Sequence, residues 1–176
     1  MSTFIYILMV TLVFELTYGC TTEPYCSQGP YGIREGHEFN DFDLFKHTSL
    51  CSNITRIEVW YNDILQGLRL TYGSSASPLR GSNEGTHANH YIDETQWIAK
   101  VTGQVGQTPG GSTARITELA FHLNDGTMHG PYGGQGLEQA AFEAKSVPES
   151  AAGLSWISGR DGANIDMLTF FFNCII

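Results

Sequence analysis

Two short sequences recur along this chain, and internal repeats constrain a fold more strongly than local propensity does. GPYGIREG at residues 29–36 is echoed by GPYGGQG at residues 130–136. ITRIEVWYND at residues 54–63 is echoed by ITELAFHLND at residues 116–125. Two such pairs predict a domain built from related β units, in which RDGANID at residues 160–166 is the equivalent turn of the remaining unit.

Short apolar runs separated by turn residues make up most of the chain. At residues 54–59 the side chains alternate roughly every second residue, as in a strand with one buried face. Clusters of Gly, Ser, Thr and Asn interrupt such runs about every ten residues. The most helix-like composition, at residues 136–145, is bounded by turn signals that argue against a long helix. We therefore expect an all-β domain of about a dozen short strands.

The N-terminus has the composition of a secretory signal peptide. An apolar stretch at residues 4–14 is too short to span a membrane, and small residues occur shortly before Cys20. The stretch has no preceding Lys or Arg and is followed by Glu15, so a buried N-terminal strand is the alternative. We expect removal of residues 1–19, which leaves residues 20–176 as one secreted, extracellular domain with no transmembrane segment.

Four cysteines belong to the expected mature chain: Cys20, Cys26, Cys51 and Cys174. An even number in a secreted chain predicts two disulfides, with three connectivities left open. Metal binding is the competing use, but the sequence has no CxxC pair, and HANH at residues 87–90 lacks a third ligand. Neither a metal site nor a cofactor is therefore expected. In the same compartment Asn53, in NIT, is a candidate glycosylation site.

The charge pattern excludes several partners and activities. The formal net charge is −9, and the nine Lys and Arg occur singly, so no basic stripe is available for nucleic acid or an anionic membrane. Asp161 and Asp166 are the best candidates for a paired-acid site, and no Ser–His constellation is evident. We therefore do not expect an enzyme.

Asp166 is the residue that the strand pattern explains least. It stands in IDMLTFFF, where a terminal strand should already be apolar. Either it caps its own turn by hydrogen-bonding the backbone, or it faces outward to hold a ligand. The residues alone leave both interpretations open.

Three motifs in order resemble jacalin-related lectins: GPYG at residues 29–32, GPYG at residues 130–133 and ISGRDGANIDML at residues 157–168. Among these lectins the chain looks most like the secreted animal zymogen-granule members, over residues 27–172. The resemblance implies a β-prism I fold, in which three four-stranded Greek-key sheets surround a pseudo-threefold axis. It also implies a carbohydrate-binding lectin whose partners are mannose- or glucose-type glycans or glycoproteins. Homo-oligomerisation is left open.

The resemblance further implies where the sugar binds. One loop would have the form Gly-x-x-x-Asp, with Gly162, Ala163, Asn164, Ile165 and Asp166. The other would be the glycine-rich loop from Gly32 to Gly36. Asp166 would accept two sugar hydroxyls, and the amides of Asn164, Ile165 and the Gly32 turn would donate. A third loop, at residues 126–132, would flank the pocket, and Tyr132 could reach a sugar face.

The glycine-rich loop departs from the mannose-type pattern. Those members tend to have a run of glycines, whereas Ile33, Arg34 and Glu35 precede Gly36 here. Such side chains could narrow the pocket, so the alternative is a structural secreted β-prism protein of mucus, egg coat or matrix with a decayed sugar site. Galactose-type members use a free N-terminus beside this loop, which is not expected here because residues 20–28 precede it. Mannose or glucose is therefore favoured.

Overall fold

The computed structural model describes residues 25–45, 53–108, 110–111, 113–145 and 153–173. The predicted signal peptide and the cysteines Cys20, Cys51 and Cys174 lie outside these ranges, so signal cleavage and disulfide pairing stay predictions. Cys26 lies in the first strand and is not a free thiol. Within the same ranges, no helix is both long and apolar enough to cross a bilayer.

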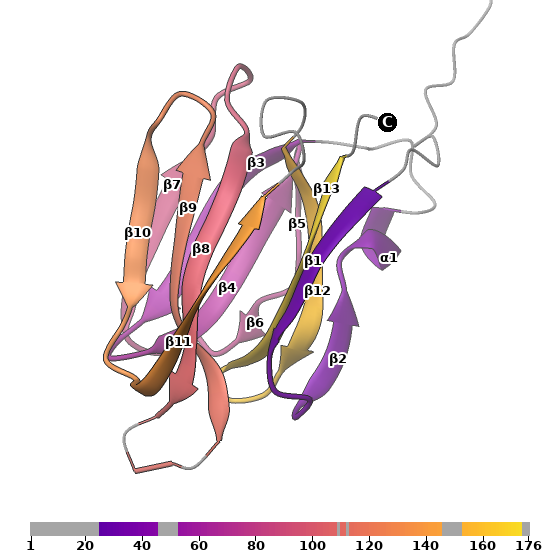
Figure 1. Ribbon diagram of the computed structural model, residues 1–176. Helices are drawn as coiled ribbons and strands as arrows, with labels where there is room; N and C mark the ends of the chain where they lie inside the picture. Colours follow the sequence, from indigo (N-terminus) through magenta and orange to yellow (C-terminus); the bar gives the residue numbers. More distant parts are fainter. Residues whose placement is uncertain (1–24, 46–52, 109, 112, 146–152, 174–176) are drawn as a thin grey trace, which may run out of the picture.

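Thirteen strands and one short helix make up the described chain (Figure 1). In order they are β1 (Tyr25–Gly32), β2 (His37–Asn40), α1 (Phe42–Phe45), β3 (Ile54–Tyr61), β4 (Leu65–Tyr72), β5 (Ser75–Ala76), β6 (Arg80–Gly81), β7 (Thr86–Tyr91), β8 (Ile98–Gln107), β9 (Ala114–Leu123), β10 (Met128–Gly133), β11 (Leu137–Lys145), β12 (Leu154–Asp161) and β13 (Ile165–Asn173). The segment with the most helix-like composition is strand β11, so the prediction against a long helix there is confirmed.

The strands form three antiparallel sheets. Sheet A has the order β1-β13-β12-β2, sheet B the order β5-β4-β3-β7 with β6 also paired to β4, and sheet C the order β10-β9-β8-β11. Sheet A joins the two ends of the domain, because β1 pairs with β13. The predicted all-β class and three-sheet architecture are confirmed.

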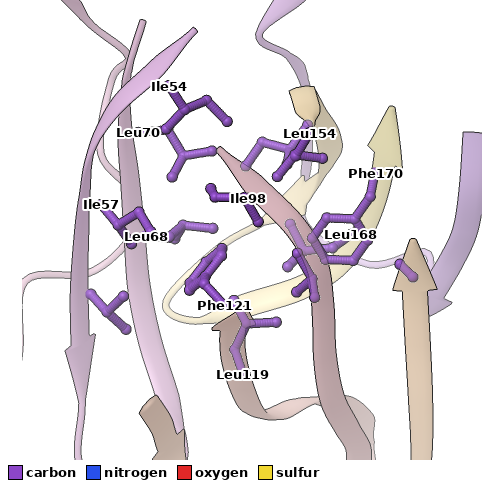
Figure 2. Packing of buried hydrophobic residues seen from close by; sticks show 14 of the residues in the cluster. Ile54, Ile57, Leu68, Leu70, Ile98, Leu119, Phe121, Leu154, Leu168 and Phe170 are labelled. Atoms are coloured by element: carbon purple, nitrogen blue, oxygen red, sulfur yellow. The ribbon is translucent and has the colours of Figure 1, made fainter. Parts of the chain in front are cut away.

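Alternate side chains of the inner strands of all three sheets point into one shared core (Figure 2). In β13, Leu168, Phe170 and Phe172 are fully buried while the residues between them are partly exposed. Leu119 and Phe121 of β9 meet them from sheet C. Burying a large apolar side chain contributes about 1.5–3 kcal/mol, so this shared centre is the main stabilising element of the domain.

Each sheet repeats one close contact between an edge strand and an inner strand. A glycine with positive φ packs so tightly against a main-chain carbonyl that a Cβ on the glycine would overlap the oxygen. The three pairs are Gly32 with Asp166, Gly81 with Gln66, and Gly133 with Thr117. The residue after each glycine donates its N–H to the same carbonyl at 2.9–3.0 Å. Three matching contacts establish a pseudo-threefold relation in which β13, β4 and β9 are equivalent.

This relation confirms one sequence repeat and corrects the other. The GPYG segments of β1 and β10 occupy equivalent edge positions, each beside an inner strand. The repeat between residues 54–63 and 116–125 joins non-equivalent strands, because β3 corresponds to β12 whereas β9 corresponds to β13. The two segments match because buried strands share an alternating pattern, wherever they lie in a sheet.

The β12–β13 turn does have an equivalent, between β3 and β4. Gly162 N–H donates to the Asn164 carbonyl at 3.0 Å, and Asn62 N–H donates to the Ile64 carbonyl at 3.1 Å. The related units predicted from the sequence therefore exist, with residues 62–64 as the partner of this turn.

Substitution of Gly133 should test the glycine–carbonyl contact in a sheet that lacks Asp166. Gly133 and Gly126 both have positive φ, 85° and 89°, so alanine is strained at each. Only at Gly133 would the new Cβ overlap a carbonyl, since nothing lies within 4 Å at Gly126. In urea denaturation we expect Gly126→Ala to cost about 1 kcal/mol and Gly133→Ala roughly 3 kcal/mol. Equal losses would contradict the contact's importance.

Candidate functional site

The two loops that the sequence pairs meet at one end of the prism. The β1–β2 loop and the β12–β13 turn both lie at the lower end in Figure 1. A Cβ on Gly36 would lie 2.6 Å from Asp166 Oδ2, and one on Gly162 would lie 3.4 Å from the same atom. Only a glycine at position 36 therefore lets the β1–β2 loop approach the carboxylate this closely, whereas a Cβ at position 162 would make an ordinary contact.

Asp166 ends the inward-facing row of β13. It lies two residues before Leu168 on the same face of the strand, and it is only 4% exposed. Among the described residues none donates a hydrogen bond to its carboxylate, so it does not cap its own turn. It does not face outward either, but points into the end of the prism interior. The nearest opposite charge is Arg115, whose Nε lies 3.6 Å from Asp166 Oδ1.

Burial raises the pKa of the Asp166 carboxyl above its ordinary value. Arg115 lowers this pKa, while the negative charges of Glu35 and Asp161 raise it. Because burial disfavours the ionised form, the fold keeps a carboxylate here at a cost in stability. Donors from a bound ligand would offset that cost.

Side chains from the other two sheets hold the β12–β13 turn. In the amide orientation that satisfies its neighbours, Asn164 Oδ1 accepts a hydrogen bond from Arg115 Nη1 at 2.8 Å. Its nitrogen donates to Gln66 Oε1, also at 2.8 Å. Arg115 is the second residue of β9 in sheet C, and Gln66 belongs to β4 in sheet B. Neither residue was singled out from the sequence.

The two loops that meet at the carboxylate carry main-chain donors without partners. The N–H groups of Glu35, Gly36, Ala163 and Asn164 make no hydrogen bond to another residue in the described part of the chain. The β1–β2 loop is fixed through the main-chain carbonyl of Gly36, which accepts a hydrogen bond from Arg160 Nη1 at 3.1 Å. One buried acceptor beside several free donors can bind a compound that both donates and accepts hydrogen bonds, such as a polyol.

Two other residues predicted to contact the sugar serve the fold instead. Gly32 packs against the Asp166 main chain and serves the fold. Ile165 is fully buried at the start of β13. Among the predicted donors, the amide of Asn164 is therefore the one that lies in the open part of the turn.

Tyr132, which was expected to reach a sugar face, packs in the hydrophobic core. It is 5% exposed, and its ring lies 5.2 Å from that of Tyr61. Burial, reinforced by Tyr61, raises the pKa of Tyr132 to about 12. Gly126 lies in the β9–β10 hairpin at the opposite end of the prism from the β12–β13 turn (Figure 1). Residues 126–132 therefore do not form the expected third wall beside Asp166.

The remaining predicted positions lie away from these loops. Asn53 is exposed just before β3, where a glycan would meet no steric barrier from burial. His87 stacks on Trp60 and His90 stacks on His129, with ring centroids 4.4 and 4.1 Å apart. Within the described ranges no group of three or more His, Cys, Asp or Glu could hold a metal ion.

Only one of the three equivalent inner positions carries an acid. Gln66 and Thr117 stand in sheets B and C where Asp166 stands in sheet A. Gln66 Nε2 donates to Asn62 Oδ1 at 2.9 Å, and Thr117 Oγ1 donates to the Gln104 carbonyl at 3.2 Å. Both side chains donate a hydrogen bond within their own sheets, whereas the Asp166 carboxylate accepts none from the described residues of its sheet.

The model of the jacalin-like lectin domain matches residues 28–171, which is most of the chain and includes both loops. The chain belongs to the jacalin-like lectin domain family. Lectins are carbohydrate-binding proteins, so the family agrees with a site made of one acceptor and several main-chain donors. No curated protein sequence matches the chain significantly.

Solved structures of jacalin-related lectins share the fold. Frutapin, a lectin from Artocarpus incisa, is 19% identical, with a TM-score of 0.70 over 84% of this chain and 96% of its own. A mannose-binding jacalin-related lectin from Ananas comosus is 19% identical, with a TM-score of 0.69 over 86% and 99%. Artocarpin in complex with mannotriose is 19% identical, with a TM-score of 0.69 over 84% and 96%. These similarities confirm the β-prism I fold.

Asp166→Asn should not destabilise this lectin domain at neutral pH. The folded-state pKa of Asp166 lies above that of the unfolded chain, so wild-type stability is lost as pH rises through the interval between the two values. Asparagine does not ionise, so the variant avoids this loss of stability, and its side-chain oxygen remains an acceptor for Arg115. We expect the variant to melt at or above wild type at pH 7, with the gain disappearing below about pH 3.5.

Thermal melting between pH 3 and pH 8 measures this effect. Asp63→Asn is the matched control, because Asp63 is exposed in the equivalent turn of sheet B. It removes one acidic group at an exposed position, and it should melt close to wild type at pH 7. A large drop in melting temperature for Asp166→Asn at pH 7 would mean that the carboxylate has a structural role.

Proposed function

We propose that the chain is a secreted lectin that binds mannose- or glucose-type glycans, with Asp166 as the principal acceptor. One observation carries this proposal: the nearly buried Asp166 carboxylate has no hydrogen-bond donor from the described residues, and the two loops that approach it carry main-chain N–H groups that also lack partners. Buried polar groups in native proteins are usually paired. A hexose would supply donors to the buried carboxylate and would replace water at the N–H groups of the exposed loops, because each hydroxyl donates one hydrogen bond and accepts others.

The charge balance of the site favours a neutral sugar. Arg115 offsets Asp166, while Glu35 lies on the exposed loop and adds negative charge nearby. The whole chain carries a formal charge of −9, so sulfated or carboxylated glycans would be repelled at long range. Mannose-type ligands are supported by the solved relatives, which include a mannose-binding lectin and a mannotriose complex.

The Asp166 carboxylate would accept two hydroxyl groups of one pyranose ring. Ala163 and Asn164 would donate their main-chain N–H groups to oxygens on the same edge of the ring. Hydrogen bonds to a charged group contribute roughly 1.5–3 kcal/mol each, which makes Asp166 the main determinant of affinity.

A structural β-prism protein with a decayed sugar site is the second candidate. The low exposure of Asp166 favours it, as do the side chains of Ile33, Arg34 and Glu35 in the glycine-rich loop. In that case Arg115 would be the permanent partner of Asp166, and no mannoside would bind.

Calorimetry with methyl α-mannoside distinguishes the two candidates. The wild-type domain should bind, and Asp166→Asn should lose roughly ten- to a hundredfold in affinity, because an amide cannot accept two hydroxyls with charge assistance. Asp63→Asn should bind like wild type. A wild-type domain that binds neither mannoside nor glucoside would support the structural candidate, and an Asp166→Asn variant with full affinity would remove Asp166 from the site.

Secretion has a separate test, in a eukaryotic secretory host. We expect the protein in the medium to begin near Cys20, with its four cysteines oxidised, when intact mass and N-terminal peptides are measured. Retention in the cell with Met1 intact and free thiols would contradict the signal peptide and the two disulfides. Treatment with a glycosidase that removes N-linked glycans would show in the same sample whether Asn53 is modified.

A further inference from the structure

Arg115 makes contacts that a simple surface cation would not make. Its side chain is 19% exposed, and its Nε is buried without a hydrogen-bond partner in the described chain. The Nε atom lies 3.6 Å from Asp166 Oδ1, while Nη1 donates to Asn164 Oδ1 at 2.8 Å. One guanidinium therefore contacts both elements that the proposed site requires, the acceptor and the turn that carries the donors.

We propose that Arg115 is a positioning residue for carbohydrate binding, which holds the Asp166 carboxylate and the β12–β13 turn in the arrangement that receives a hexose. This inference rests on the proposed function and extends it. The residue comes from sheet C, outside both loops of the site, so the local Gly-x-x-x-Asp pattern does not include it.

The distance to Asp166 leaves the carboxylate free to bind a sugar. At 3.6 Å the contact is longer than a hydrogen bond, so Arg115 attracts the carboxylate without occupying its lone pairs. The planar guanidinium presents several N–H groups in a fixed geometry, and this allows it to contact Asp166 and Asn164 at once. A lysine at the same position would supply one point charge and could not hold both groups.

Arg115 also has a distinct electrostatic effect on the acceptor. The charged groups that face Asp166 are Glu35 from the β1–β2 loop, Asp161 from β12 and Arg115 from β9. Among them, Arg115 lowers the pKa of Asp166, whereas burial and the two acids raise it. Without Arg115 the carboxyl would take up a proton at a higher pH. A protonated carboxyl has one oxygen that donates, and it has no charge to strengthen the hydrogen bonds that it still accepts from hydroxyls.

Gln66 allows the two roles of Arg115 to be separated. It holds the other side of the Asn164 amide at 2.8 Å and carries no charge. Gln66→Met should therefore loosen the turn without changing the ionisation of Asp166. Arg115→Met should disturb both, and Arg115→Lys should keep the charge while losing the hydrogen bond to Asn164.

The test is calorimetric titration with methyl α-mannoside from pH 4.5 to pH 8, with circular dichroism to verify folding. Arg115→Met should bind at least about tenfold more weakly at pH 7, and the acidic decline of binding should move to higher pH. Arg115→Lys should restore the wild-type pH dependence with reduced affinity. Gln66→Met should reduce affinity with the acidic decline unchanged.

Two results would overturn the proposal. The first is an Arg115→Met variant that folds and binds with wild-type affinity and pH dependence. The second is an Arg115→Lys variant that binds methyl α-mannoside as tightly as the wild-type protein. This result decides the matter if Arg115→Met does not fold. Failure of the unmutated domain to bind methyl α-mannoside or glucoside at any pH would instead overturn the proposed function, and this inference with it.

Discussion

The close contact of Gly32, Gly81 and Gly133 with an inner-strand carbonyl, which all three sheets share, determines the end of the prism where the candidate site lies. No side chain fits between Gly32 and the Asp166 carbonyl, and the next N–H group bonds to that same oxygen. The edge strand must therefore leave its sheet at this level. The side chain of the inner strand at this level points into the end of the interior, beneath the departing loop.

The backbone frame is threefold, but the chemistry is not. Gln66, Thr117 and Asp166 share one position in the three sheets, and only Asp166 is ionisable. Arg115 and Gln66 both reach Asn164 from other sheets, so side chains of all three sheets meet at the turn of sheet A. The repeated contact supplies the scaffold, and differences among the end residues make one site rather than three.

The sequence was sufficient for the fold class, and it singled out Asp166 as the residue that the strand pattern explains least. The alternation of apolar residues and the two GPYG segments reflect local backbone conformation. Both patterns can therefore be recognised in the sequence without information on tertiary contacts. The direction of Asp166 could not be predicted, because it depends on which face of β13 meets the core. The similarity between β3 and β9 was misleading for the same reason: alternation reports burial, and it does not report position in a sheet.

Tertiary contacts account for the residues that were misplaced or missed. Tyr132 follows a glycine and a proline like a loop residue, yet it is covered by Tyr61 from another sheet. Arg115 has no local signal, since its partners Asp166 and Asn164 lie far away in the sequence. Gln66 could have been found by aligning NDILQ with GANID, the two equivalent turns and the residues that follow them.

Three acids are buried in the described structure, and comparing them shows why Asp166 is unusual. Asp41 accepts hydrogen bonds from Tyr72 at 2.8 Å and from Arg80 at 2.6 Å. Glu58 accepts two from Arg69, each at 2.7 Å, and these bonds lower its pKa.

Both acids follow the usual rule that buried charges are paired and hydrogen-bonded, because an unpaired one is costly. Asp166 has a cation nearby and no hydrogen bond from a described residue, although the same chain supplies such donors twice elsewhere. A carboxylate kept in that state at the end of the core is more readily explained by a ligand that completes it than by a contribution to stability.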